Sequence, residues 1–177
     1  MNPAASPAGA MRILGLAGWS GSGKTTLLIR LLPELIGRGL AVSTLKHAHH
    51  EFDIDQPGKD SWRHRQAGAS EVIVASAKRW ALIREHRGAL EPPLAALLPH
   101  MAPVDLILVE GFKRESHAKL EVHRPALGKP LLCRQDPCIV AVASDAPVPG
   151  LDLPLLALDD AAAIAQFIVD HFGIGAS

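Results

Sequence analysis

Eight consecutive residues, Gly18 to Thr25 (GWSGSGKT), constrain the fold of this chain more than any other feature of its sequence. They match the pattern G-x-x-x-x-G-K-[ST], follow a short apolar run at 12–17 and precede apolar residues at helical spacing. Glycine lets the backbone turn tightly, so that successive N–H groups point inward at phosphate oxygens, and a following helix adds its positive end. The motif therefore predicts a strand, a phosphate-binding loop and a helix in succession.

The side chains of this loop predict a site for nucleotide phosphates and Mg²⁺. Lys24 is expected to reach the β- and γ-phosphates, and the Thr25 hydroxyl to bind Mg²⁺. Trp19 stands where the ParA/MinD-like ATPases carry an extra lysine, which argues against that group. The predicted nucleotide contacts in the loop are Gly18, Ser20, Gly21, Ser22, Gly23, Lys24, Thr25 and Thr26.

Strand-like and helix-like segments alternate along the chain, which indicates an α/β fold of the P-loop NTPase type, a mostly parallel sheet covered by helices. Strands are expected at 12–17, 40–46, 104–109, 120–123, 139–143 and 155–158, and helices from 24, from 60, at 92–100 and from 159 or 160 to 171. The β-prone runs within 71–84 predict a small β-hairpin extension. We expect one domain over 11–173, after a Pro/Ala-rich lead-in at 1–10 and before a tail at 174–177.

A phosphate site of this kind needs an acid at the carboxyl end of a neighbouring strand to hold Mg²⁺. Glu110 directly follows the apolar run VDLILV and is our choice. Asp105 competes, but it lies at the start of the same run and hence at the opposite edge of a parallel sheet. Asp53, Asp55 and Asp60 are further candidates for Mg²⁺ or for positioning water. We take Lys24, Asp53 and Glu110 as the catalytic candidates.

The loop after the second predicted strand collects polar and charged residues at the same edge. For these residues contact with a substrate or partner competes with a solvated loop, and a metal site for the histidines lacks a second cluster to complete it. Asp60, followed by Ser61, is an equally good helix N-cap. The candidates for substrate or partner contact are His47, His49, His50, Asp60, Arg63 and His64, together with Lys113 after Glu110.

Asp145 follows a late apolar strand, in the sequence VASD. Guanine-binding proteins carry N-K-x-D in a comparable place, and the Asp bonds N1 and N2 of the base. Here the Asp is present, whereas the Asn and Lys are not. Reading the base and forming a turn before Pro147 remain alternative roles for Asp145.

Charge and composition exclude several classes of protein. The chain has 18 basic and 18 acidic residues, but residues 135–177 hold six Asp and no Lys or Arg. A cationic site for a small anion fits this split better than a nucleic-acid surface, and seven aromatic residues are few for stacking on bases.

The sequence also lacks the signals of membrane and secreted proteins. No apolar run approaches the length of a membrane span, and the start lacks the features of a secretory signal. Cys133 and Cys138 are expected to be free thiols in the cytoplasm.

Four segments together resemble the MobB family of molybdopterin-guanine dinucleotide biosynthesis adapter proteins. They are ILGLAGWSGSGKTTL, TLKHAHHEFDIDQPGKDSWRHRQAGA, DLILVEGFKRESHAKLEV and VAVASD. The resemblance runs from about Met11 to the end of the last predicted helix. It is carried by the second and third segments, because the phosphate loop alone is shared by many functions.

The resemblance implies a GTP-binding protein with weak GTPase activity. It would assist the nucleotidyltransferase MobA, which joins GMP from GTP to the phosphate of molybdopterin. It implies that Gly18 to Thr26 hold the triphosphate, that Glu110 serves Mg²⁺, and that the segment from His47 to Arg65 lies near the pterin or the partner protein. It also implies a homodimer whose contact includes the hairpin at 71–84.

Two other functions use the same phosphate loop. A small-molecule kinase needs an arginine-rich lid, for which Arg84 and Arg87 are the only pair. A metal-insertion GTPase of the nickel type has relatives with Cys/His clusters near the nucleotide, which this sequence lacks.

Overall fold

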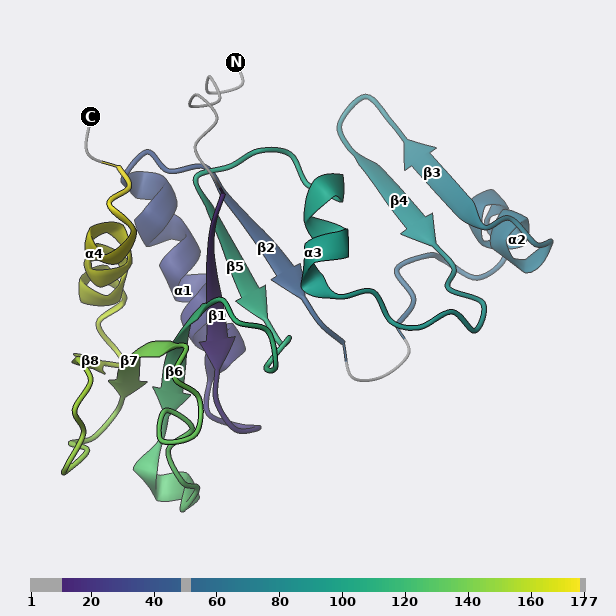
Figure 1. Ribbon diagram of the computed structural model, residues 1–177. Helices are drawn as coiled ribbons and strands as arrows, with labels where there is room; N and C mark the ends of the chain where they lie inside the picture. Colours follow the sequence, from purple (N-terminus) through teal and green to yellow (C-terminus); the bar gives the residue numbers. More distant parts are fainter. Residues whose placement is uncertain (1–10, 49–51, 176–177) are drawn as a thin grey trace. The chain divides into compact units, whose positions relative to one another are not determined.

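The computed structural model describes residues 11–48 and 52–175 (Figure 1). The chain forms two compact units, one made of residues 1–47 and 101–177 and the other of residues 48–100. We describe each unit by itself and call them the nucleotide unit and the inserted unit. No helix among the described residues is long and apolar enough to cross a membrane.

The nucleotide unit is built on a six-stranded sheet in the order β2-β5-β1-β6-β7-β8, in which every pairing is parallel. This confirms the predicted fold class. Its strands are β1 (Arg12–Ala17), β2 (Val42–Lys46), β5 (Leu106–Glu110), β6 (Ala118–His123), β7 (Ile139–Ser144) and β8 (Leu155–Ala157). The first connection leads from β1 into α1 (Lys24–Gly37), and the last helix of the unit is α4 (Ala161–Phe172).

Helices α1 and α4 lie side by side and pack on one face of this sheet (Figure 1). The side chains of α1 that recur at helical spacing are buried there, with Leu31 and Leu35 fully so. Helix α4 begins at the N-cap Asp160, whose carboxylate accepts a hydrogen bond from the Ala163 amide at 2.9 Å. The predicted last helix is therefore confirmed, with Asp160 as its cap.

The other face of β6 is polar and yet buried. Lys119, Glu121 and His123 alternate along the strand and are at most 7% exposed. The Glu121 carboxylate accepts hydrogen bonds from the backbone amides of Leu132 and Cys133, at 2.8 and 2.9 Å. The segment between β6 and β7, which includes the short 3-10 helix η2 (Pro125–Leu127), is thus held over the sheet by buried polar groups.

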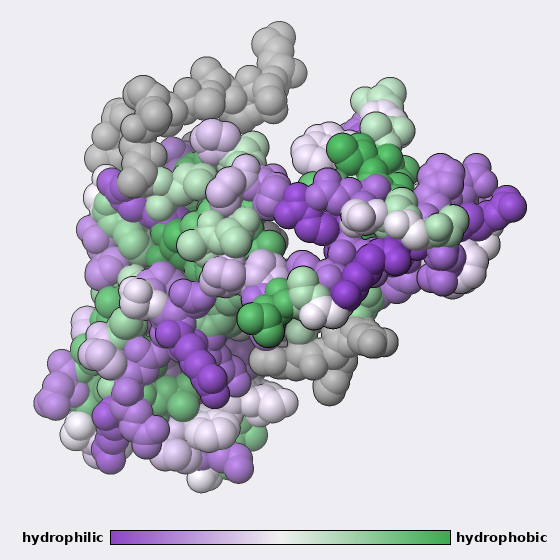
Figure 2. All heavy atoms as spheres, turned by 45° about the vertical axis from the view of Figure 1, so that its right-hand side comes forward, coloured by the Kyte–Doolittle hydropathy of each residue, from purple (hydrophilic) through white to green (hydrophobic). Residues whose placement is uncertain are grey.

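The inserted unit contains α2 (Asp60–Gln66), an antiparallel hairpin of β3 (Glu71–Ala75) and β4 (Trp80–Arg84), α3 (Leu94–Leu97) and the 3-10 helix η1 (Leu98–His100). The predicted hairpin is confirmed. Its strands leave apolar side chains at the surface, and Figure 2 shows such side chains gathered on this unit among polar ones. The exposed ones on the hairpin are Ile73, Val74 and Trp80.

Candidate functional site

The phosphate loop connects β1 to α1 through glycines that adopt backbone conformations rare for other residues. Gly23, the N-cap of α1, has φ +98°. Gly18 has φ +148°, and a Cβ added there would lie 2.6 Å from the Val122 carbonyl oxygen and from the Ser22 hydroxyl. Only glycine therefore fits position 18. The hydroxyl of Ser22 is buried and has no hydrogen-bond partner among the described residues.

Lys24 folds back over this loop. Its Nζ donates to the carbonyl oxygens of Gly18 and Trp19, both at 3.0 Å. Burial lowers the pKa of Lys24, and the nearby charge of Glu110 opposes that shift. The ammonium group is thus held at the loop by weak carbonyl acceptors, which phosphate oxygens would replace with charge-assisted bonds.

Glu110 and Thr25, which the sequence predicts as partners at Mg²⁺, are brought together by the sheet. Glu110 ends β5 and is level with Leu16 of β1. Its carboxylate accepts a hydrogen bond from the Thr25 hydroxyl, at 2.9 Å to Oε1. The competing Asp105 is at the far edge of the sheet, where it accepts from the Ala41 amide at 2.8 Å. A hydroxyl and a carboxylate are oxygen ligands of the kind that Mg²⁺ prefers.

His47 packs behind the end of β5. Its amide donates to the Glu110 carbonyl at 2.7 Å, and its ring lies against that of Phe112, with centroids 4.9 Å apart. Gly111, at φ +103°, makes this approach possible, because a Cβ there would overlap the Cβ of His47. Phe112 itself has a positive φ of 48°. His47 therefore helps to fix the turn that follows Glu110. His49 and His50 lie outside the described residues.

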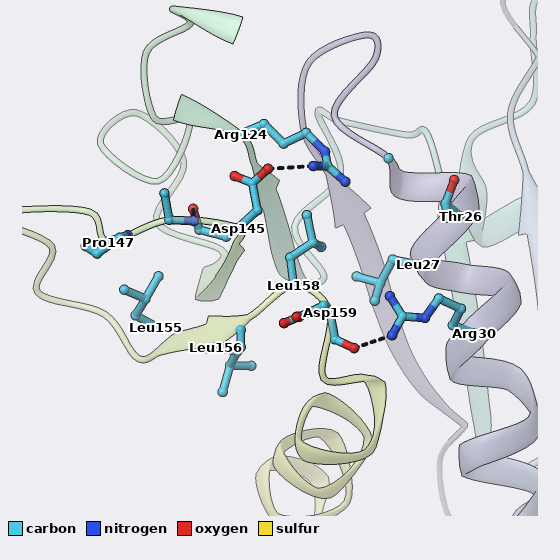
Figure 3. Close-up of a pocket in the computed structure, with 14 residues that line it drawn as sticks. Thr26, Leu27, Arg30, Arg124, Asp145, Pro147, Leu155, Leu156, Leu158 and Asp159 are labelled. Atoms are coloured by element: carbon cyan, nitrogen blue, oxygen red, sulfur yellow. Dashed lines mark hydrogen bonds and ion pairs between the residues drawn. The ribbon is translucent and has the colours of Figure 1, made fainter. Parts of the chain in front are cut away.

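A pocket of about 480 Å³ lies beside the phosphate loop (Figure 3), within the range of about 300–1,000 Å³ typical of ligand sites. Residues from the start of α1 form one side, and the ends of β6, β7 and β8 form the rest. Asp145 directly follows β7 and lines the pocket, as a base-reading residue would. The polar and charged side chains of the lining are Thr26, Arg30, Arg124, Ser144, Asp145 and Asp159.

Arg124, like Arg30, is a charged residue of this pocket that the sequence analysis did not single out. It directly follows β6, and its guanidinium forms an ion pair with Asp145 (Figure 3). Arg30 lies across the pocket and donates to the backbone carbonyl of Asp159. The sequence signal that could have pointed to Arg124 is a cation at the carboxyl end of a strand. Strand β6 is only weakly predicted from the sequence, however, because it carries Lys, Glu and His.

The remaining predicted site residues other than Lys113 belong to the inserted unit. Asp53 accepts hydrogen bonds from the Asp55 amide and the Arg65 guanidinium, and these lower its pKa. Arg65 also binds the carboxylates of Asp55 and Glu85, so this cluster ties the loop before α2 to the end of the hairpin. Asp53 is thus held by a largely buried cation.

Helix α2 departs from the expected cap. Its N-cap is Lys59, with no side-chain hydrogen bond, and Asp60 is the first helical residue, so the alternative role of Asp60 as N-cap is wrong. Asp60 pairs loosely with Arg63 at 3.9 Å, and both side chains are largely exposed, as is His64.

Lys113, the last of the predicted contact residues, lies in the nucleotide unit. Its side chain is exposed, and its backbone carbonyl accepts a hydrogen bond from Lys119.

A small-molecule kinase would need Arg84 and Arg87 for a lid, and a metal-insertion GTPase would need a cluster of metal ligands. Arg84 pairs with Glu71 across the hairpin, and Arg87 donates to the carbonyls of Arg65 and Ala69. Both arginines are therefore engaged within the inserted unit. Within residues 11–48 and 52–175, no group of three or more His, Cys, Asp or Glu side chains is placed to hold a metal ion.

Comparison with known proteins gives consistent matches. Residues 13–145 match the family model described as "Molybdopterin guanine dinucleotide synthesis protein B". The chain is 46% identical over 161 residues to the molybdopterin-guanine dinucleotide biosynthesis adapter protein of Escherichia coli, covering 89% of this chain and 91% of the relative. The corresponding protein of Haemophilus influenzae is 44% identical over 163 residues, covering 90% of each.

The similar solved structures belong to the same family as these relatives. The crystal structure of a molybdopterin-guanine biosynthesis protein B superposes with a TM-score of 0.71 at 30% identity, covering 90% of this chain and 99% of the other. A MobB homologue from Bacillus stearothermophilus gives a TM-score of 0.66 at 25% identity.

Proposed function

This chain belongs to the family of molybdopterin guanine dinucleotide synthesis protein B, and from that premise we propose that it is a GTP-binding adapter in the biosynthesis of this dinucleotide. The observation that carries the proposal is the assembly of three parts at one edge of one sheet. These are the phosphate loop, the Thr25–Glu110 pair and the pocket that contains Asp145.

The pocket supports guanine as the base. A carboxylate is an acceptor of hydrogen bonds only, and guanine offers the N1–H and N2–H groups side by side as donors. Adenine presents an unprotonated N1 on the corresponding edge, so it would face the Asp145 carboxylate with a lone pair. GTP is therefore the nucleotide that this site suits.

The phosphate end supports Mg²⁺ as the companion ion. Thr25 and Glu110 would hold it, and when bound it neutralises charge on the β- and γ-phosphates. Lys24 would exchange its two carbonyl partners for phosphate oxygens. Because Glu110 would be engaged with Thr25 and the metal, it would be poorly placed to orient an attacking water, and we expect only weak GTPase activity. Asp53, whose charged form the Asp55 amide and Arg65 both favour, is our candidate for positioning that water.

The proposed role is to assist the nucleotidyltransferase MobA in attaching GMP to molybdopterin. We propose that the protein acts as a homodimer through the hairpin of β3 and β4, and that the segment from His47 to Arg65, with Lys113, faces the pterin or the partner. The apolar surface of the hairpin supports the homodimer contact, and the exposed polar residues of α2 support the contact with the pterin or the partner.

Nucleotide binding tests the first half of the proposal. We expect GTP with Mg²⁺ to bind the full chain in calorimetry, and Lys24→Ala to weaken binding at least 100-fold, because the phosphates lose their main cation. Asp145→Asn should lower the affinity for GTP and raise that for xanthosine triphosphate, since an amide can donate to the xanthine O2. Unchanged GTP affinity in Lys24→Ala would refute the assignment of the phosphate loop.

The role as an adapter needs a second measurement. In a mixture of the nucleotidyltransferase, molybdopterin and limiting GTP with Mg²⁺, the wild-type protein should raise the yield of molybdopterin guanine dinucleotide, and Lys24→Ala should not. An equal yield with and without the wild-type protein would contradict this role while leaving GTP binding intact.

A further inference from the structure

We infer that Arg124 is a positioning residue that determines base specificity by holding the Asp145 carboxylate toward the base pocket and tying it to the phosphate loop. The inference rests on the proposed function, since it concerns the same nucleotide site. It adds a residue that neither the phosphate-loop motif nor the expected guanine motif contains.

The contacts of Arg124 link three parts of the nucleotide unit. Its Nη1 binds Asp145 Oδ2 at 2.5 Å, and its Nε donates to the Ser22 carbonyl at 3.0 Å. The guanidinium lies over Gly23, where an added Cβ would be 3.5 Å from Nη2. In Figure 3 the side chain spans the gap between Asp145 and the start of α1. One planar group therefore connects the end of β6, the turn after β7 and the phosphate loop.

Asp145 needs such a partner because its own surroundings fix it weakly. It lies in an exposed turn before Pro147, and its side chain is 36% exposed. A carboxylate in that setting has several accessible rotamers, and ordering it on binding would cost affinity. The bond from Arg124 occupies Oδ2 but leaves further acceptor positions on both oxygens, so guanine N1–H and N2–H can still be accepted.

The fork of the guanidinium matters as well as its charge. Arg124 uses Nε and Nη1 at the same time, toward two acceptors that come from different elements. A lysine ammonium is a point charge on a flexible stem and lacks this fixed planar geometry. Arg124→Lys should therefore keep the local charge and lose the alignment of Asp145.

The test compares GTP with inosine triphosphate, which lacks the 2-amino group of guanine and keeps the same phosphates. A site built to bond an N–H rejects the analogue without it, so the wild-type protein should bind GTP more tightly. We expect Arg124→Lys and Arg124→Gln to reduce the ratio of the two affinities about tenfold, close to its value in Asp145→Ala. In the Asp145→Ala background, Arg124→Lys should change the ratio no further. Arg114→Gln, an exposed arginine of the same unit, is the control.

Three other outcomes would overturn the inference about Arg124. Equal loss of GTP and inosine triphosphate affinity in Arg124→Lys would mean a phosphate or folding role, and would overturn the inference. So would a wild-type ratio in that variant, although a switch to xanthosine triphosphate in Asp145→Asn would then leave the proposed function standing. If the wild-type protein does not distinguish the two nucleotides, base reading by Asp145 fails and the inference fails with it. Circular dichroism and thermal unfolding identify any variant that does not fold, and Arg124→Lys keeps the test open if Arg124→Gln is such a variant.

Discussion

The buried position of the His117 ring depends on a glycine, Gly15, that lies against it. Its Nε2 occupies the space that a Cβ of Gly15 would need, and neither ring nitrogen has a hydrogen-bond partner among the described residues. Burial, followed by the charge of Lys119, lowers the pKa of His117, although Glu115 and Asp136 oppose the shift. The folded protein therefore favours the neutral imidazole more than the unfolded chain does.

This shift predicts a loss of stability in mild acid. Because the pKa of His117 is lowered from 6.5, the unfolded state binds more protons just below that pH, and the free energy of unfolding should fall as the pH drops through about 6.5. Urea unfolding at pH 5.5, 6.5 and 7.5 measures the slope. His117→Leu should flatten it, with His64→Leu on exposed α2 as the control for loss of an imidazole. A slope equal to that of the wild type in His117→Leu would contradict the assignment.

At the scale of elements, the sequence predicted the buried strands well and the polar ones less well. The runs that became β1 and β5 are apolar on both faces, as a covered parallel sheet requires, so their position and the place of Glu110 at the end of β5 could be read directly. Strand β6 buries Lys119 and Glu121, which a reading based on hydrophobicity places in solvent. Arg124 at its end was missed for a related reason. Its partners, Ser22 and Asp145, are remote in sequence, and only the sheet order brings them together.

The turn after β5 gives a prediction about an element boundary. Gly111→Ala should lower the free energy of unfolding by about 2–5 kcal/mol, because it combines a positive φ with a clash against His47. Gly150→Ala is the matched control. Gly150 also has a positive φ, of +69°, but an added Cβ meets nothing within 4 Å, so the cost should be about 1 kcal/mol. Equal losses in urea unfolding would show that His47 does not constrain the turn.

At the scale of the whole molecule, the fold brings part of the acidic stretch of the sequence against its basic part. The acidic stretch after residue 134 supplies partners for the basic part before it. Asp136 binds Lys119, and Asp145 binds Arg124. Asp160 instead caps a helix. Asp170 accepts a hydrogen bond from Gln166 at 2.9 Å, so four of the six late carboxylates are committed to contacts within the nucleotide unit, which a count of charges could not reveal.

The homodimer is the prediction that concerns the whole molecule. Ile73 and Trp80 of the hairpin are 65% and 64% exposed, and a contact between chains would bury this apolar surface. Ile73→Lys combined with Trp80→Lys should yield a monomer in analytical ultracentrifugation, while GTP affinity stays within about twofold. Leu90→Lys is the control, because Leu90 is 94% exposed but lies outside the hairpin. A dimer that survives the double change would place the contact elsewhere, and a monomeric wild type would contradict the homodimer itself.

The sheet order also bears on how the chain is made. The phosphate loop leaves the ribosome early, with β1, but Leu14 pairs with Leu108 and Ala118, on the order of a hundred residues later. Until those strands emerge, β1 has no neighbour in the sheet and Thr25 has no Glu110. Strands β6, β7 and β8, by contrast, pair in the order in which they are synthesised. The phosphate loop, the most recognisable part of the sequence, is therefore completed late in synthesis, because a nascent chain gains Glu110 and the two neighbours of β1 only after β5 and β6 have appeared.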